Sequence, residues 1–103
     1  PKPSKKRHKH KASMLQENKE CYQTGRTDNL HIHHIYMGAN RKISDENGFW
    51  VWLTGAWHNQ DPRIDVHHNI EFDRYLKRTC QAKFEETHIR DEFMALIGEN
   101  YIW

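Results

Sequence analysis

The sequence contains no long hydrophobic run and few cysteines. No segment approaches the roughly 18 consecutive apolar residues that a membrane-spanning helix needs, and the first residues lack the apolar stretch of a signal peptide. Two cysteines, Cys21 and Cys80, are present, and a chain made without an export signal lies among reduced thiols. We therefore expect a cytoplasmic protein with no membrane contact and no disulfide bond.

Apolar residues are also scarce, at 36% of the 103 residues. Four Trp, four Tyr and four Phe offset this scarcity, because each aromatic side chain can bury a large area. The length and composition suit a single domain with a small core.

Acidic residues are missing from the first twelve positions, which hold five Lys and one Arg. The rest of the chain has ten basic and fourteen acidic residues. Because the opening segment is also polar and aperiodic, we predict a flexible basic arm at 1–19 and an ordered domain at 20–103. Such an arm can bind nucleic-acid phosphates by releasing counterions, and a solubilising tail is an equally good interpretation.

Two strands are predicted in the first half of the domain. Residues 21–29 are rich in turn formers, and 30–37 alternate apolar and polar side chains until the alternation breaks. The polar segment 38–48, bounded by glycines, indicates a loop, and 49–55 is an aromatic and β-branched second strand. Together these features predict a β-hairpin with a long loop, and the break permits a bulge.

The second half of the domain is predicted to be helical. One helical turn follows the second strand before Pro62 interrupts it. Asn69 is a suitable N-cap for a helix over 70–86, whose apolar side chains recur every four residues. A shorter helix over 89–97 ends at Gly98. The sequence thus predicts an α+β fold in which a β-hairpin precedes two C-terminal helices.

Histidine is unusually frequent, and its placement carries most of the chemical information. Nine histidines are present, and six of them lie between residues 31 and 68. A neutral imidazole binds divalent ions and also titrates near physiological pH, so one histidine can bind a metal while another acts as a base. In a regular strand His33 and His34 point to opposite faces, and only a bulge would turn both toward one site.

The pair His33-His34, followed by Ile35, resembles the first-strand motif of the HNH, or ββα-metal, endonuclease family. Segments similar to CYQTGRTDNLHIHHI, ANRK, VWL, HN and VH occur in this order in small phage HNH-like proteins, including the recombination-enhancement nuclease group. The resemblance spans about residues 20–103. It implies a small ββα-metal domain and a phage-encoded, metal-dependent DNA endonuclease acting in the bacterial host cell.

The resemblance also assigns roles to individual histidines. His34 matches the general base that takes a proton from the attacking water, which is worth roughly 10²- to 10⁴-fold in rate. His33, His58 and His67 match the ligands of one divalent ion, Mg, Mn, Ni or Zn, with His68 as a reserve. The ion would bind a phosphate oxygen and stabilise charge on the departing sugar oxygen.

Two further residues are candidates for the catalytic machinery. Arg41 in the predicted loop would hold a neighbouring phosphate, as would Lys42, and ordinary solvated charges are an equally good interpretation of both. The family carries its middle asparagine at the start of the second strand, where this chain has Gly48 and Phe49. Asn59, which directly follows a proposed ligand, is our substitute. The other nearby asparagines are Asn40, Asn47 and Asn69.

Many relatives also carry a structural zinc, bound by one Cys-x-x-Cys before the first strand and a second Cys-x-x-Cys or Cys-x-x-His after the second. The corresponding positions here are Cys21, Thr24, Thr54 and Trp57. One thiolate, two hydroxyls and an indole cannot complete a zinc tetrahedron, so we expect no structural zinc. Packing of tryptophans and hydrogen bonds from the threonine hydroxyls would replace its contribution.

The histidine pattern has other interpretations. A purely structural metal site or a histidine-rich surface would place similar residues here, and for His31 and His68 an ordinary surface role is favoured. The main alternative to a nuclease is a catalytically degenerate HNH fold that binds DNA or a recombination or host protein. The lost zinc ligands and the displaced asparagine favour that alternative. Removal of a structural metal would unfold the protein instead of merely silencing it.

Overall fold

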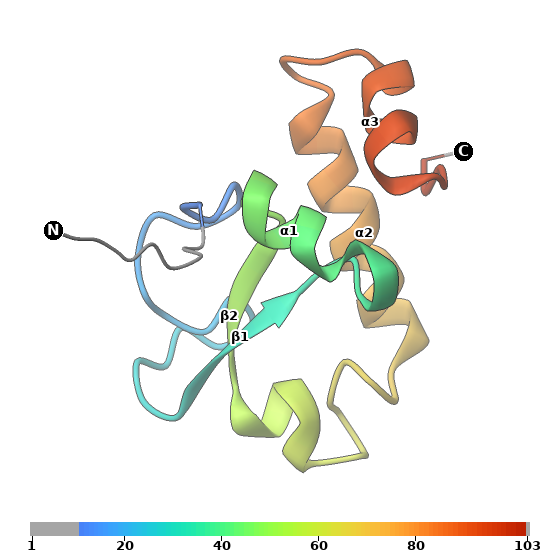
Figure 1. Cartoon of the computed structure of the whole chain (residues 1–103). Coiled ribbons are helices and arrows are strands. Elements are labelled where there is room, and N and C mark those ends of the chain that lie inside the picture. The colour runs from blue at the N-terminus through green and yellow to red at the C-terminus, as the bar shows by residue number, and fades with distance from the viewer. Residues whose placement is uncertain (1–10, 103) are drawn as a thin grey trace, which may run out of the picture.

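Two antiparallel strands and three α-helices make up the part of the chain that the computed structural model describes, residues 11–102 (Figure 1). In chain order the elements are β1 (Leu30–His34), the 3-10 turn η1 (Gly38–Asn40), α1 (Arg41–Asn47), β2 (Trp50–Thr54), the π-helical turn η2 (Ala56–Gln60), α2 (Ile70–Phe84) and α3 (Arg90–Ile97). The predicted α+β class is confirmed. Most of the predicted arm lies outside the described residues.

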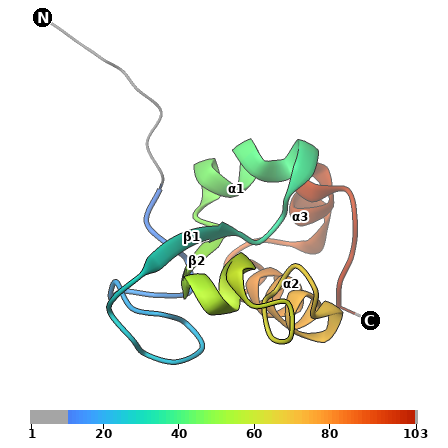
Figure 2. The same ribbon diagram turned by 90° about the horizontal axis from the view of Figure 1, so that it is seen from below.

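The two strands form a regular antiparallel pair. Five consecutive residue pairs join them, from Leu30 opposite Thr54 to His34 opposite Trp50. No bulge interrupts this ladder, so adjacent side chains on β1 point to opposite faces. β1 is also shorter than predicted, because the chain leaves the sheet directly after His34. Figure 2 shows the hairpin lying between α1 on one side and η2 with α2 on the other.

The prediction of a polar loop at 38–48 is wrong, because most of this segment is helical. The pattern was misleading since the buried face of α1 is polar. Ser44 is fully buried, and its hydroxyl donates to the carbonyl of Tyr36 at 2.7 Å and accepts from the Tyr36 amide at 3.2 Å. These bonds remove the cost of burying a hydroxyl. The helix ends at Gly48, which adopts a left-handed conformation with φ of 75°.

The two C-terminal helices supply much of the core, as predicted. The side chain of Asn69 accepts a hydrogen bond from the Phe72 amide at 3.1 Å and caps α2. The predicted apolar stripe of α2 is buried, and α3 ends at Gly98 with φ of 87°. Between the hairpin and these helices lies Phe49, whose ring contacts those of Phe84 and Phe93, with centroids 5.6 and 6.4 Å apart.

Residues 11–19, which the sequence analysis assigns to the arm, are bound to β2 and α1. The Lys11 amide donates to the carbonyl of Asp45 at 3.0 Å. The Ser13 hydroxyl donates to the carbonyl of Trp50 at 2.6 Å, and the Trp52 amide donates to the side chain of Gln16 at 2.8 Å. The packed part of the chain therefore begins before residue 20.

Both cysteines are free and buried. Cys80 lies in the apolar stripe of α2, as predicted, and burial raises the pKa of its thiol to about 12. It therefore behaves as a small apolar side chain. None of the helices within residues 11–102 combines the length and the apolar character needed to cross a membrane.

We predict that Gly48→Ala destabilises the fold more than Gly98→Ala. Both glycines end a helix at a positive φ, so each substitution carries a similar backbone penalty of about 1–2 kcal/mol. A Cβ at residue 48 would also clash with the carbonyl oxygen of Ala12, whereas at residue 98 it would meet nothing within 4 Å. We expect an additional loss of about 1–3 kcal/mol for Gly48→Ala, measured by urea unfolding. Equal losses would contradict the packing of residues 11–14 against α1.

Candidate metal centre

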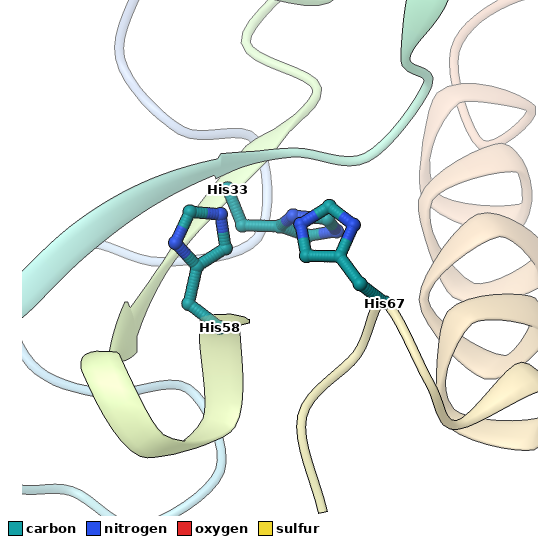
Figure 3. A group of neighbouring side chains, drawn as sticks. All are labelled: His33, His58 and His67. Atoms are coloured by element: carbon teal, nitrogen blue, oxygen red, sulfur yellow. The ribbon is translucent and has the colours of Figure 1, made fainter. Parts of the chain in front are cut away.

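Three histidines from three separate elements converge on one point, and we call them the three-histidine cluster: His33, His58 and His67. His33 comes from β1, His58 from η2 and His67 from the segment before α2. One ring nitrogen of each lies within 4.8 Å of those of the other two. Figure 3 shows the rings turned toward one another. Within residues 11–102, no other group of three or more His, Cys, Asp or Glu side chains is close enough to share an ion.

His33 is the innermost member of the cluster. Its side chain is 1% exposed, and its Nε2 atom is buried without a hydrogen-bond partner. Burial, followed by repulsion from His58 and His67, lowers the pKa of His33 to about 3. The ring is therefore neutral at physiological pH. A buried polar atom without a partner is costly, and a divalent cation at Nε2 would remove that cost.

His58 presents a second neutral imidazole. Burial lowers its pKa to about 4, with further contributions from repulsion by His67 and His31. One of its ring nitrogens faces the other two histidines, and the second faces away from them (Figure 3). The Nδ1 atom lies 3.0 Å from Nδ1 of His31. Neutral imidazoles are the form of histidine that binds a metal ion.

His67 closes the cluster at the surface and is exposed. Its neighbour His68, the reserve ligand, points elsewhere. The His68 Nδ1 atom lies 2.8 Å from Oδ1 of Asp65, a fully buried carboxylate that also accepts from the His68 amide. The structure thus places His67 and not His68 in the cluster. Three protein ligands at an exposed edge leave coordination positions open for water or substrate, as in catalytic zinc sites.

His34 lies on the opposite face of β1 from His33 and contacts α1. Its Nε2 atom is 2.5 Å from Oδ1 of Asp45, and both side chains are largely buried. Because an ionised carboxylate can only accept, the imidazole donates this hydrogen bond. Asp45 therefore fixes the orientation of the His34 ring. This partner is not predicted from the sequence, because Asp45 falls in the segment predicted as a loop.

A pocket of about 260 Å³ joins these groups. Its walls include the three-histidine cluster, His34 and Arg41. β1 ends at His34, so the chain turns away there and both faces of the strand end contribute to the same hollow. Arg41 opens α1 and is exposed. The pocket thus places a positive charge beside a group that can bind a cation.

The other predicted site residues lie outside this pocket. Asn59 is exposed on η2 and is not part of the pocket wall. Asn40 is used structurally, because its side chain donates to the carbonyl of Ile97 at 3.0 Å. Lys42 points into solvent and lies 3.8 Å from Glu46. Of the two predicted phosphate contacts, the structure therefore brings Arg41 and not Lys42 to the cluster.

The four positions that correspond to a structural zinc site also meet in space. The Thr54 amide donates to Sγ of the buried Cys21 at 3.4 Å. Burial alone would raise the pKa of the Cys21 thiol, but hydrogen bonds from Thr24, Thr54 and Gln23 outweigh this and lower it. Trp57 packs against the ring of Phe72, with centroids 5.5 Å apart. Hydrogen bonds thus connect Cys21 with Thr24 and Thr54, and Trp57, which lines the same hollow as the two threonines, packs on α2.

No family model, curated protein or solved structure matches the chain.

We predict that the protein binds one divalent ion per chain through the three-histidine cluster. Titration of the metal-free protein with Zn²⁺, Ni²⁺ or Co²⁺ in a calorimeter should give a stoichiometry of one. Loss of an outer hydrogen-bond partner of a ligand weakens metal binding by about 10- to 100-fold, and loss of a ligand itself should cost at least as much. We therefore expect His33→Ala, His58→Ala and His67→Ala each to weaken binding by about 100-fold or more. His68→Ala, which removes a neighbouring ring bound to Asp65, should keep the stoichiometry of one. Unchanged affinity in His67→Ala would contradict the assignment.

We also predict that the metal-free protein loses stability as the pH falls from 7 to 4. The pKa of His33 is about 3 in the fold and 6.5 ordinarily, so below pH 6.5 the unfolded chain binds a proton that the folded chain does not. At about 1.4 kcal/mol per pKa unit, His33 alone lowers the free energy of unfolding by about 2 kcal/mol at pH 5. Urea unfolding measures this slope. His33→Gln should flatten it, and an equal slope in that variant would contradict the buried neutral histidine.

Proposed function

We propose that this protein is a metal-dependent endonuclease that hydrolyses phosphodiester bonds of DNA. The observation that carries the proposal is a single pocket whose walls hold the three-histidine cluster, a further histidine and an arginine. Phosphodiester hydrolysis needs a cation for the phosphate charge, a base for water and a contact that positions the phosphate. The resemblance of the His33-His34 motif to HNH endonucleases supports the same reaction.

A divalent ion in the cluster would supply Lewis-acid stabilisation of the phosphate and of the departing sugar oxygen. His34, held by Asp45, accepts a proton from the attacking water. The water oxygen forms a bond to phosphorus, the bond from phosphorus to the sugar oxygen breaks, and the sugar oxygen takes a proton from solvent. Arg41 holds a neighbouring phosphate through its guanidinium group. His34 projects from the other face of β1 and is not a member of the three-histidine cluster, so the base and the ligands are different side chains.

DNA is the proposed partner because the pocket combines these groups with an exposed arginine. Six of the sixteen basic residues lie in residues 1–12, which contain no acidic residue, and most of this segment lies outside the described residues. Nonspecific contacts between basic side chains and DNA phosphates weaken steeply as the salt concentration rises, because each neutralised phosphate releases counterions. The proposal therefore includes an affinity for DNA that falls as the ionic strength rises.

A binding module without catalysis is the second candidate. Asn59 is exposed and lies outside the pocket wall, and none of the described asparagines lines the pocket. The absence of an asparagine from the pocket wall favours this candidate. Such a module would hold DNA, or a recombination or host protein, at the same surface. It would bind plasmid without cutting it.

Incubation of supercoiled plasmid with the full chain and Mg²⁺, Mn²⁺, Ni²⁺ or Zn²⁺ tests the proposal. We predict nicking with at least one of these ions, and a loss of about 10²- to 10⁴-fold in His34→Ala. Metal binding should survive in this variant, because His34 is outside the cluster. His88→Ala is the matched control. His88 lies in the loop between α2 and α3, at the far end of the molecule from η2 (Figure 1), and its removal should leave nicking unchanged.

The outcomes separate the candidates. Absence of nicking with every ion, together with retained plasmid binding, would replace the nuclease by the binding module. Nicking by His34→Ala at the native rate would remove the base assignment alone. Unfolding on addition of a chelator, followed by circular dichroism, would instead identify the cluster as a structural centre.

A further inference from the structure

His31 contacts the three-histidine cluster without belonging to it. Its Nδ1 atom lies 3.0 Å from Nδ1 of His58, and the two rings meet edge to face with centroids 5.1 Å apart. His31 is not in the group whose ring nitrogens can share an ion. The contact is therefore a hydrogen bond between two imidazoles, of which one can bind a metal.

The placement of His31 follows from the strand that carries His33. Residues two apart on a strand share a face and lie roughly 6.6 Å apart along it. β1 thus presents His33 as a ligand and His31 as a neighbour of the next ligand, His58. The regular pairing of both residues with β2, His31 opposite Leu53 and His33 opposite Val51, holds them in this relation.

His58 is carried by η2, a turn of five residues with no side-chain cap. Within the cluster its ring contacts those of His33 and His67, with centroids 5.5 and 5.3 Å apart. The contact with His31 adds a hydrogen bond to this ring from outside the cluster. In Figure 3 one ring nitrogen of His58 faces away from the cluster, where a residue outside the cluster can contact it. The contact with His31 is made by Nδ1 of His58.

We infer that His31 is a positioning residue, which orients His58 and selects the ring nitrogen that this histidine offers to the ion. A neutral imidazole has one protonated nitrogen and one lone pair. If Nδ1–H of His58 donates to Nδ1 of His31, the lone pair of His58 is at Nε2, on the side of the cluster. His31 must then carry its own proton on Nε2. Outer partners of this kind fix the tautomer of a ligand histidine.

This inference rests on the metal centre of the preceding proposal but not on DNA cleavage. Its test compares two substitutions of similar size in the full chain. His31→Leu removes the acceptor, and we expect the affinity for Co²⁺ or Zn²⁺ to fall about 10- to 100-fold, while the melting temperature of the metal-free protein and the stoichiometry of one are retained. His31→Gln keeps an acceptor oxygen, and its affinity should lie clearly above that of His31→Leu. His88→Leu is the matched control, with native affinity expected.

A second measurement reads the proton positions directly. Long-range ¹H–¹⁵N correlation spectra of the zinc-loaded protein distinguish the two tautomers of each histidine. We expect the proton of His58 on Nδ1 and that of His31 on Nε2. Native affinity in His31→Leu, equal affinities in the Leu and Gln variants, or a proton on Nδ1 of His31 would each overturn the inference.

The two proposals fail in different ways. If the native protein binds none of these ions, the metal centre and the role of His31 are both wrong. If it binds an ion but does not nick plasmid, the nuclease proposal is wrong and the role of His31 stands on the affinity and tautomer data.

Discussion

The five-pair register between β1 and β2 is the constraint on which the site depends. Because side chains alternate along a strand, this register directs His31 and His33 to the face shared with η2, and His34 to the face covered by α1. A slip of one residue would exchange the two sets and separate His33 from His58 and His67. The proposed roles of His33 as a metal ligand and His34 as a base would therefore follow from strand geometry, although the two histidines are adjacent in the sequence.

The fold places its uncompensated polar atoms near the three-histidine cluster. Among the described residues, the buried side-chain atoms without a hydrogen-bond partner are His33 Nε2, Asp65 Oδ2 and Asp73 Oδ1. The buried carboxylate of Asp65 interacts electrostatically with His58 and His67. Such atoms oppose folding when they stay unpaired. A bound cation would offset this cost at His33 and would be attracted by Asp65, so metal binding would stabilise the fold.

The sequence indicated the parts of the site that depend on residue type and spacing. The frequency of histidine between residues 31 and 68 indicated the region, and the resemblance to HNH endonucleases selected the three cluster members from six candidates. The helix α2 is predicted because its apolar residues recur every four positions. α1 was missed because its buried face carries Ser44 and Asp45, whose burial depends on partners elsewhere in the chain. The partners of the histidines were missed for the same reason. His31, Asp45 and Asp65 gain their roles from contacts that no local pattern encodes.

The contacts of residues 13–22 with β2 have a further consequence for the hairpin. A two-stranded sheet has two open edges, and an open edge can pair with a strand of another molecule. On the outer side of β2, the carbonyl of Trp50 accepts from Ser13, the amide of Trp52 donates to Gln16, and the carbonyl of Trp52 accepts from the Tyr22 amide at 2.8 Å. These bonds occupy the positions that an intruding strand would use. The irregular segment of residues 13–22 thus covers the outer edge of β2 and opposes edge-to-edge aggregation.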